Sequence, residues 1–344
     1  QEESSALEFV PKPPVSCFIG HTRVQLKACV DASPVLSGSF YYIGCQGGIL
    51  ARVHADTLRL ASYTDDCGSN QCSVICQDHR VYAFAHEDVG AHVACFDESI
   101  QICHWQCRLP TGIKTTPLWL DGFLFAQSGK YVWKIGAQTG KLVQEWGLPA
   151  FVEARPVRLK NELLYLSCES EFGKMISLRN DNSCCDVVQI QDIFLGPVYK
   201  DPLLLTNETL VVTDSWGCVH FLSLHRGPGE TVAVSSCPLS AAVEMRREVV
   251  VGSLDGTVYG LSYEHSILWK VEVDSSVYSQ PAVYGDYLVV VTTAGYIVVC
   301  DGDSVAQRHR ITGEIWSDPV SCIPSSVCFG ARDSCLHQLV LCVS

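Results

Sequence analysis

A glycine returns along this chain at intervals of 39 to 44 residues, each time between two short apolar segments. The series is Gly48, Gly90, Gly129, Gly173, Gly217, Gly256 and Gly295. At Gly48, Gly129 and Gly256 the pattern indicates a tight hairpin, where glycine adopts a positive φ at little cost. A lone hairpin is only marginally stable in water, so such units must pack against one another. A period near ~40 residues built from short strands predicts a β-propeller.

The number of units follows from a short signature that opens each of them. A small or polar residue precedes a proline, and an apolar residue follows, as expected for a strand that begins at an unpaired edge beside a central channel. The signature occurs at Ser33-Pro34-Val35, Thr116-Pro117-Leu118, Arg155-Pro156-Val157, Gly196-Pro197-Val198, Gln280-Pro281-Ala282 and Asp318-Pro319-Val320. Two further units start without proline, at Ser73-Val74-Ile75 and Ser240-Ala241-Ala242. These starts predict eight blades, with seven as the alternative if one degenerate unit is an insertion.

The two ends of the chain complement each other. Other units close with an outer strand around a large residue, such as Trp105 or Trp269, but the last unit stops after Leu339–Leu341 without one. A spare strand lies at Thr22–Cys29, before the first unit. We predict that this strand completes the final blade, because ring closure removes exposed sheet edges. The predicted fold is therefore an all-β, eight-bladed propeller, one domain over residues 16–344 after a linker tail over residues 1–15.

Composition excludes several classes of function. Hydrophobic residues make up 47% of the chain and charged residues 18%, which fits many buried strands and not disorder. No apolar run approaches the ~18 residues of a membrane span. The net charge is −13 without a Lys or Arg cluster, so neither nucleic acid nor an anionic membrane is an expected partner. Gln1–Pro14 lacks the features of a signal peptide, and the absence of an initial methionine indicates a piece of a larger protein or a processed form.

The chain holds 19 cysteines, an odd number. Several lie within apolar strand segments, where cysteine behaves as a small hydrophobic residue. These are Cys45, Cys95, Cys218, Cys300, Cys328 and Cys342. Secreted disulfide frameworks favour short, loop-rich chains with paired cysteines. We therefore expect free thiols in a reducing compartment and a cytoplasmic or nuclear protein, with the cytoplasm preferred.

The units resemble the pyrroloquinoline-quinone-like repeat, Ala-x-Asp-x-x-Thr-Gly-x-x-x-Trp. Cys95-Phe96-Asp97 leads to Trp105 at the expected offset, and Gly260-Leu261-Ser262 leads to Trp269 likewise. Thr139-Gly140 is present, but Gln144 stands in place of the tryptophan, with Trp146 two positions further on. The resemblance implies tryptophans that dock between blades, retained at only a few positions here.

Three longer segments are similar to the C-terminal propeller of the animal beta-alanine-activating enzymes, which are adenylate-forming, nonribosomal-peptide-synthetase-like proteins. The segments are Ala28–Pro34, Trp269–Pro281 and Gly313–Pro319, within a resemblance that spans about Ser16 to Ser344. It implies a parent ATP-dependent ligase with upstream adenylation and phosphopantetheine carrier domains. This chain contains neither a glycine-rich phosphate loop nor a carrier serine motif. The resemblance thus implies a non-catalytic domain that docks the upstream domains of its own polypeptide, or an acceptor protein.

Two alternatives remain open: a quinone-dependent oxidoreductase propeller and a free-standing scaffold. Quinoproteins hold pyrroloquinoline quinone between a tryptophan and a vicinal disulfide, and the only adjacent cysteines here, Cys184-Cys185, are expected at a blade periphery. Against the scaffold of the WD-repeat type, Trp-Asp and Gly-His dipeptides do not recur.

No catalytic, cofactor-binding or metal-binding residue is predicted. Cysteines four apart on one strand, such as Cys72 and Cys76 or Cys103 and Cys107, lie ~13 Å apart and cannot share an ion. Ser253, between Gly252 and Gly256, leads into a hairpin and is no nucleophile elbow. The loops of one face and the axial channel form the default binding site. Trp119 and Trp216 are expected to pack between blades rather than to anchor a partner.

Overall fold

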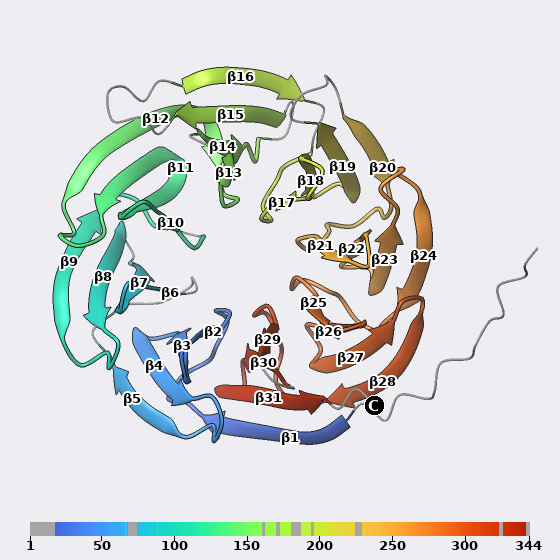
Figure 1. Ribbon diagram of the computed structural model, residues 1–344, viewed down its shortest axis with the longest axis horizontal. Coiled ribbons are helices and arrows are strands. Elements are labelled where there is room, and N and C mark those ends of the chain that lie inside the picture. Colours follow the sequence, from blue (N-terminus) through green and yellow to red (C-terminus); the bar gives the residue numbers. More distant parts are fainter. Residues whose placement is uncertain are drawn as a thin grey trace, which may run out of the picture.

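Eight antiparallel sheets surround a central axis (Figure 1). This computed structural model describes residues 18–65, 67, 74–87, 89–113, 115–159, 162–169, 173–179, 187–193, 196–223, 229–322 and 326–341. All the regular elements named in these ranges are strands. A search of the same ranges finds no helix with the length and apolar character that crossing a bilayer requires. The prediction of an all-β propeller with eight blades is confirmed, and seven blades are excluded.

In each blade the strands follow one another from the axis outward. Blade 1 comprises β2 (Val35–Ser37), β3 (Phe40–Cys45), β4 (Ile49–His54) and β5 (Leu60–Thr64). Blade 2 comprises β6 (Ile75–Gln77), β7 (Arg80–His86), β8 (Ala91–Asp97) and β9 (Cys103–Leu109). Blade 3 comprises β10 (Leu118–Leu120), β11 (Phe123–Gly136) and β12 (Leu142–Val152). Blade 4 comprises β13 (Val157–Leu159), β14 (Glu162–Leu166), β15 (Gly173–Arg179) and β16 (Val187–Ile193).

Blade 5 comprises β17 (Leu203–Leu204), β18 (Thr209–Thr213), β19 (Cys218–Ser223) and β20 (Glu230–Ala233). Blade 6 comprises β21 (Val243–Met245), β22 (Glu248–Gly252), β23 (Thr257–Leu261) and β24 (Ile267–Glu272). Blade 7 comprises β25 (Ala282–Tyr284), β26 (Tyr287–Val291), β27 (Tyr296–Asp301) and β28 (Ser304–Arg310). Blade 8 comprises β29 (Val320–Cys322), β30 (Ser326–Ala331), β31 (Cys335–Leu341) and, from the other end of the chain, β1 (Phe18–Gln25).

The first strand closes the ring. β1 runs antiparallel to β31, in a register that ends with Gln25 opposite Cys335. The predicted strand at Thr22–Cys29 was therefore placed four residues too far along the chain. β31 begins at Cys335, so the residues after Gln25 have no strand to pair with and cross to blade 1 instead. Residues 1–15, the predicted linker, lie outside the described residues.

Seven predicted blade starts lie where an innermost strand begins, although Ser73 in one of them lies outside the described residues. The start at Gly196-Pro197-Val198 is wrong, because β17 begins only at Leu203. Asp201-Pro202-Leu203 carries the same signature and is the true start. The earlier segment is held elsewhere: the Gly196 amide donates to Asp214 Oδ2 at 2.9 Å, and Ser215 N donates to the Pro197 carbonyl at 3.1 Å.

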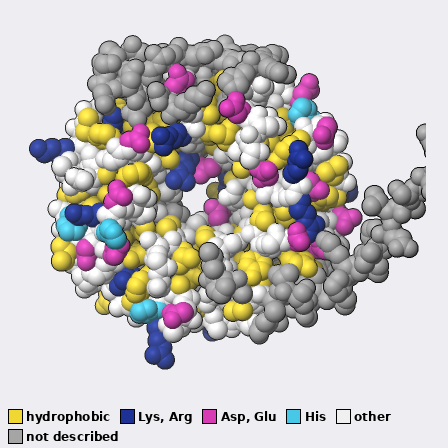
Figure 2. All heavy atoms as spheres, in the orientation of Figure 1, with side chains coloured by type: hydrophobic (Ala, Val, Ile, Leu, Met, Phe, Trp, Pro, Cys, Tyr) yellow, Lys and Arg dark blue, Asp and Glu magenta, His cyan; other side chains and the backbone are white. Residues whose placement is uncertain are grey.

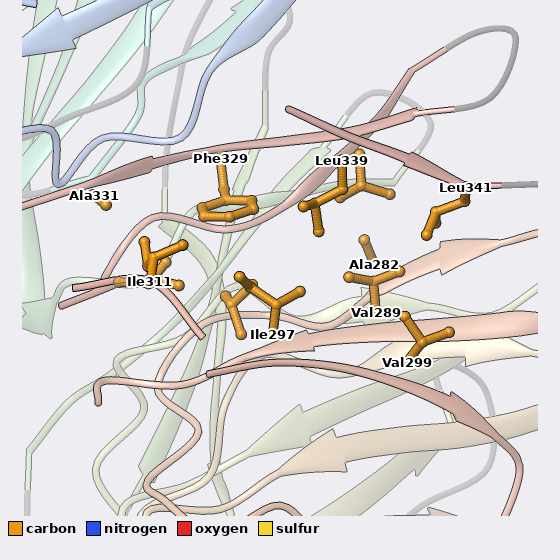
Figure 3. Packing of buried hydrophobic residues seen from close by; sticks show 12 residues of the cluster. Ala282, Val289, Ile297, Val299, Ile311, Phe329, Ala331, Leu339 and Leu341 are labelled. Carbon is orange, nitrogen blue, oxygen red and sulfur yellow. The ribbon is translucent and has the colours of Figure 1, made fainter. Parts of the chain in front are cut away.

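The core consists of eight apolar clusters, one between each pair of neighbouring blades. Figure 3 shows the cluster between blades 7 and 8, where Val289 and Ile297 face Phe329 and Leu339. Each of these side chains is at least 99% buried, and such burial stabilises by ~1.5–3 kcal/mol per side chain. Because both faces of the middle strands are covered, these strands are buried at successive positions, whereas an outer strand such as β28 alternates between exposed and half-buried positions.

The repeat tryptophans pack in two ways. Trp105 of blade 2 docks on blade 3: its Nε1 donates to the Ala137 carbonyl at 2.9 Å, and its ring lies against Gly140. Trp269 is hydrogen-bonded within its own blade, where Nε1 donates to Glu248 Oε2 at 2.7 Å, and it packs against the cluster between blades 6 and 7. Trp146 is buried and stacks on Phe125. The docking implied by the repeat resemblance is thus clearest at Trp105.

Most of the strand cysteines are core residues. Cys45, Cys95, Cys300 and Cys328 are fully buried, and Cys218 is half-buried. Burial raises the pKa of Cys45 and of Cys300 to about 12, so both thiols are protonated at neutral pH. Cys342, Cys72 and the pair Cys184-Cys185 lie outside the described residues.

Candidate functional site

The loops that connect successive blades and the hairpins between the second and third strands lie at the same end of the blades. Since consecutive antiparallel strands alternate in direction, the start of the innermost strand, the hairpin between the second and third strands and the end of the outer strand share one end of the sheet. We call this end the entry face. Its axial part comprises Asp31–Ser33, Tyr199–Asp201, Tyr278–Gln280 and Trp316–Asp318, and its outer part includes the hairpin Asp214–Gly217.

A cavity of about 200 Å³ opens at the centre of the entry face. Its walls come from the segments that lead into the innermost strands of blades 1, 3, 5, 6, 7 and 8. Figure 2 shows an opening at the middle of the disc, bordered by acidic and basic side chains. Hollows of about 450 and 470 Å³ lie at the edge of blade 2 and at the hairpin of blade 6, but they are more open and lined by one or two blades. The axial pocket is the place where distant parts of the sequence converge.

Five of the residues that line the pocket occupy the same position of the sequence repeat. They are Ser33, Thr116, Asp201, Gln280 and Asp318, and each immediately precedes the proline of a blade start. Proline ends the polar segment and begins the strand, so the preceding side chain is left at the mouth of the channel. The sequence analysis predicted the axial channel as the default binding site but named none of these residues, although the polar residue before each proline was a signal that could have revealed them.

Lys200 is the basic group of the pocket. Its Nζ donates to the Tyr278 carbonyl at 3.0 Å and lies 3.2 Å from the centroid of the Tyr278 ring. Burial lowers the pKa of Lys200 to about 8, although Asp318 and Asp201 oppose the shift. The contact with the Tyr278 ring places the Lys200 ammonium group against an aromatic face, where cation–π attraction compensates part of its lost hydration.

Asp318 joins the last blade to the first, its neighbour in the ring. One carboxylate oxygen accepts a hydrogen bond from the backbone amide of Gln280 at 2.7 Å, and the other accepts one from Ser33 Oγ at 3.1 Å. The Asp318 amide donates in turn to Ser33 Oγ at 2.9 Å. Burial raises the pKa of Asp318, while the Gln280 amide and the charge of Lys200 act in the opposite direction.

A second group of aromatic and charged side chains lies at the rim of the pocket. The Trp316 ring meets Tyr278 edge to face at a centroid distance of 5.0 Å, and the Arg332 guanidinium lies 4.9 Å from the Trp316 ring. Arg332 Nε donates to Asp31 at 2.9 Å, and its Nη1 donates to Glu314 at 3.1 Å. With Arg332 neutralising Asp31, the carboxylates of Asp201 and Asp318 face a single lysine within the described lining. The pocket therefore suits a polar or cationic group.

Exposed aromatic side chains of blades 5 and 7 lie beside this pocket on the entry face. Tyr199 is 50% exposed and Tyr278 is half-exposed, while Trp216 lies further out on the hairpin of blade 5 and is 54% exposed. The expectation that Trp216 packs between blades is wrong, because its hairpin places the ring over Gly196 with the outer side open to solvent. Trp119 is half-buried and packs against the cluster between blades 2 and 3, as expected.

The remaining sequence candidates fall outside this site. Cys103 and Cys107 both lie in β9, as expected of residues on one strand. Ser253 is fully buried, and its hydroxyl donates to Ser235 Oγ at 2.9 Å just before the hairpin into β23. The chain has strand–turn–strand geometry there and no strand-to-helix turn, so it forms no nucleophile elbow.

Comparisons with known proteins bear on the fold. The sequence matches no protein family model and no curated protein. BamB from Moraxella catarrhalis is similar in structure, with a TM-score of 0.75 and 13% sequence identity over 94% of this chain and 99% of that one. The computationally designed protein Ika8 gives a TM-score of 0.74 and 15% identity over 93% of this chain and 100% of that one. The chain thus has the fold of an eight-bladed β-propeller.

Proposed function

We propose that this chain is a non-catalytic docking propeller that holds a protein partner on its entry face. The observation that carries the proposal is the convergence of six blades on one axial pocket that is bordered by the exposed side chains of Tyr199 and Tyr278. Aromatic anchors beside a polar centre are typical of binding surfaces, where tyrosine and tryptophan supply much of the affinity. The unbalanced carboxylates of Asp201 and Asp318 fit a Lys or Arg side chain of the partner.

We further propose that the partner belongs to an adenylate-forming ligase of the beta-alanine-activating kind. The support is the resemblance of Ala28–Pro34, Trp269–Pro281 and Gly313–Pro319 to the propellers of that family. On this proposal the upstream adenylation and carrier domains, or an acceptor protein, dock on the disc. The described cysteines, Cys45 and Cys300 among them, carry free thiols, which supports the further proposal of a reducing compartment such as the cytoplasm.

The test starts from the full open reading frame. If it encodes upstream adenylation and carrier domains, these are expressed separately as the probe, and their affinity for the propeller is measured by isothermal titration calorimetry. Trp216→Ala is expected to weaken binding by about 10- to 100-fold, as for an aromatic hot spot. Leu268→Ala is the matched control, since Leu268 is similarly exposed (51%) but lies near the start of outer strand β24, at the opposite end of its blade.

The two parts of the proposal fail separately. A reading frame without an adenylation domain rejects the ligase parent and leaves the docking surface to be probed with an array of Lys- and Arg-containing peptides. Binding that Trp216→Ala and Leu268→Ala weaken equally, or that Asp201→Asn leaves unchanged, rejects the entry face as the docking surface.

A further inference from the structure

Three metal-ligating side chains gather where the chain closes on itself. Asp333 lies in the hairpin before β31, and Cys335 and His337 occupy alternate positions of that strand, so their side chains share one face. One ligand atom of each lies within 4.8 Å of the other two. His337 Nε2 is 3.1 Å from both carboxylate oxygens of Asp333. Carboxylate, thiolate and imidazole are the ligands of protein-bound zinc.

Residues from two neighbouring strands complete this cluster. His21 of β1 places Nε2 at 2.8 Å from His337 Nδ1, and its ring centroid is 5.0 Å from that of His309 in β28. His337 is fully buried and stacks on Phe329. One nitrogen of His337 thus faces the carboxylate and the other faces His21. A zinc-bound histidine typically has such a second hydrogen-bond partner, which orients the ring.

A second cluster of the same composition lies in blade 5, but its ligand atoms are already engaged. Asp214 accepts from the backbone amides of Gly196, Trp216 and Cys218 as well as from His220 Nε2. The other nitrogen of His220 lies 2.9 Å from Thr231 Oγ1. The Asp214 side chain is inaccessible to solvent. This cluster is therefore a satisfied structural network.

The carboxylate of Asp333 has fewer hydrogen-bond partners than that of Asp214. In the described part of the chain its carboxylate accepts one backbone amide, that of Cys335 at 3.1 Å, besides the imidazole of His337. Its side chain is 14% exposed, and Arg23 Nη1 approaches to 3.8 Å without replacing a ligand. Ligand atoms that share a zinc ion lie ~3.3–3.8 Å apart, given bonds of ~2.0–2.3 Å. The pair formed by Asp333 and His337 is close to this spacing, and the thiol needs a small movement at most.

We propose that Asp333, Cys335 and His337 bind a Zn²⁺ ion, with water as the fourth ligand. The Cys335 thiol gives up its proton to solvent, His337 binds through Nε2, and its Nδ1–H donates to His21 Nε2. Because His21 belongs to the first strand and the three ligands lie at the start of the last, the ion ties together the two ends of the chain. The site is independent of the docking function proposed above.

The test uses the full chain, kept reduced and stripped of metal, with ZnCl₂ as the titrant in competition with a chromogenic chelator. One equivalent of zinc is expected to bind more tightly than the background of other thiols. Cys335→Ser is expected to weaken this site at least 10-fold, and His21→Ala by about 10- to 100-fold, the usual effect of removing an outer partner of a ligand. Arg23→Gln is expected to strengthen it, because a cation near the ion is removed. Cys218→Ser, the matched change in blade 5, is expected to leave it unaltered.

Cobalt substitution identifies the ligand directly. Co²⁺ is expected to give a thiolate-to-cobalt charge-transfer band in the wild-type chain and in Cys218→Ser, but not in Cys335→Ser. Zinc is also expected to raise the melting temperature of the wild-type chain and not that of Cys335→Ser, since only the folded state holds the complete site. Equal zinc affinity and an unchanged cobalt band in Cys335→Ser overturn the proposal. If that variant does not fold by circular dichroism, the partly exposed His21→Ala decides by the same affinity criterion.

Discussion

Two glycines allow the docking of Trp105 to be weighed against a matched control. Gly140 and Gly302 both lie in the turn between the third-strand segment and the outer strand of their blades, with φ of 68° and 60°. A Cβ at Gly140 would lie 2.4 Å from Cε3 of Trp105, whereas nothing lies within 4 Å of a Cβ at Gly302. Gly302→Ala therefore reports only the cost of a left-handed backbone, ~1–2 kcal/mol. Gly140→Ala adds the clash with a ring anchored by its bond to the Ala137 carbonyl, ~1–3 kcal/mol more.

The assay is equilibrium unfolding in urea, followed by tryptophan fluorescence and extrapolated to water. We expect Gly140→Ala to lose ~2–5 kcal/mol of unfolding free energy and Gly302→Ala ~1–2 kcal/mol. A third variant combines Gly140→Ala with Trp105→Leu, which shortens the side chain and relieves the clash. The two changes should then be clearly non-additive, as expected for residues in contact. Equal losses for the two glycine variants, or additive losses in the double variant, would refute the argument that Trp105 docks tightly on blade 3.

Two further predictions concern Asp214 and the buried thiols. Burial opposes ionisation of Asp214, but hydrogen bonds from His220 and from the Cys218 and Gly196 amides hold its pKa below the ordinary 3.8. The ionised Asp214 therefore stabilises the fold above about pH 4, and this stabilisation is lost as the pH falls through the lowered pKa. Asp214→Asn should lower the unfolding free energy at pH 7 by ~1–3 kcal/mol and make that free energy less dependent on pH in the acid range. An unchanged dependence in the acid range would contradict this. Iodoacetamide should label exposed Cys103 in the native chain and label Cys45 only in urea, as followed by mass spectrometry, and native labelling of Cys45 would contradict its burial.

The fold could be predicted because its determinants are local. Each unit shows its own strand signature, turn glycine and apolar runs, and none can bury both faces of its sheet alone. The two errors in the strand assignment have different causes, one local and one distant in the sequence. A proline signature at Gly196-Pro197-Val198 preceded the true start at Asp201-Pro202-Leu203, and the closing strand was displaced because its length is set by β31 and not by its own residues.

The axial site could be predicted only in part. The polar residue before each blade-opening proline is visible in the sequence, but its partners are not. Ser33 meets Asp318 across 285 positions of the chain, and Lys200 reaches the Tyr278 carbonyl across 78. Such pairs depend on the rotation of each blade relative to the axis, which the strand pattern leaves open. The exposure of Trp216 depends likewise on the hydrogen bonds that Asp214 makes to its hairpin.

Ring closure and the axial pocket are physically the same event. Several polar contacts join the first segment of the chain to the last blade. Ser33 binds Asp318 at the axis, and Asp31 pairs with Arg332 on the entry face. His21 of the closing strand β1 contacts His337 of β31. These contacts link residues about 300 positions apart, so they form only after the largest loop in the chain has closed, at an entropic cost that rises slowly with loop length. Asp318 and Trp316 line the pocket, and they immediately precede β29, the innermost strand of blade 8. A change that loosens β1 should therefore open the binding site before it unfolds the blades on the far side of the ring.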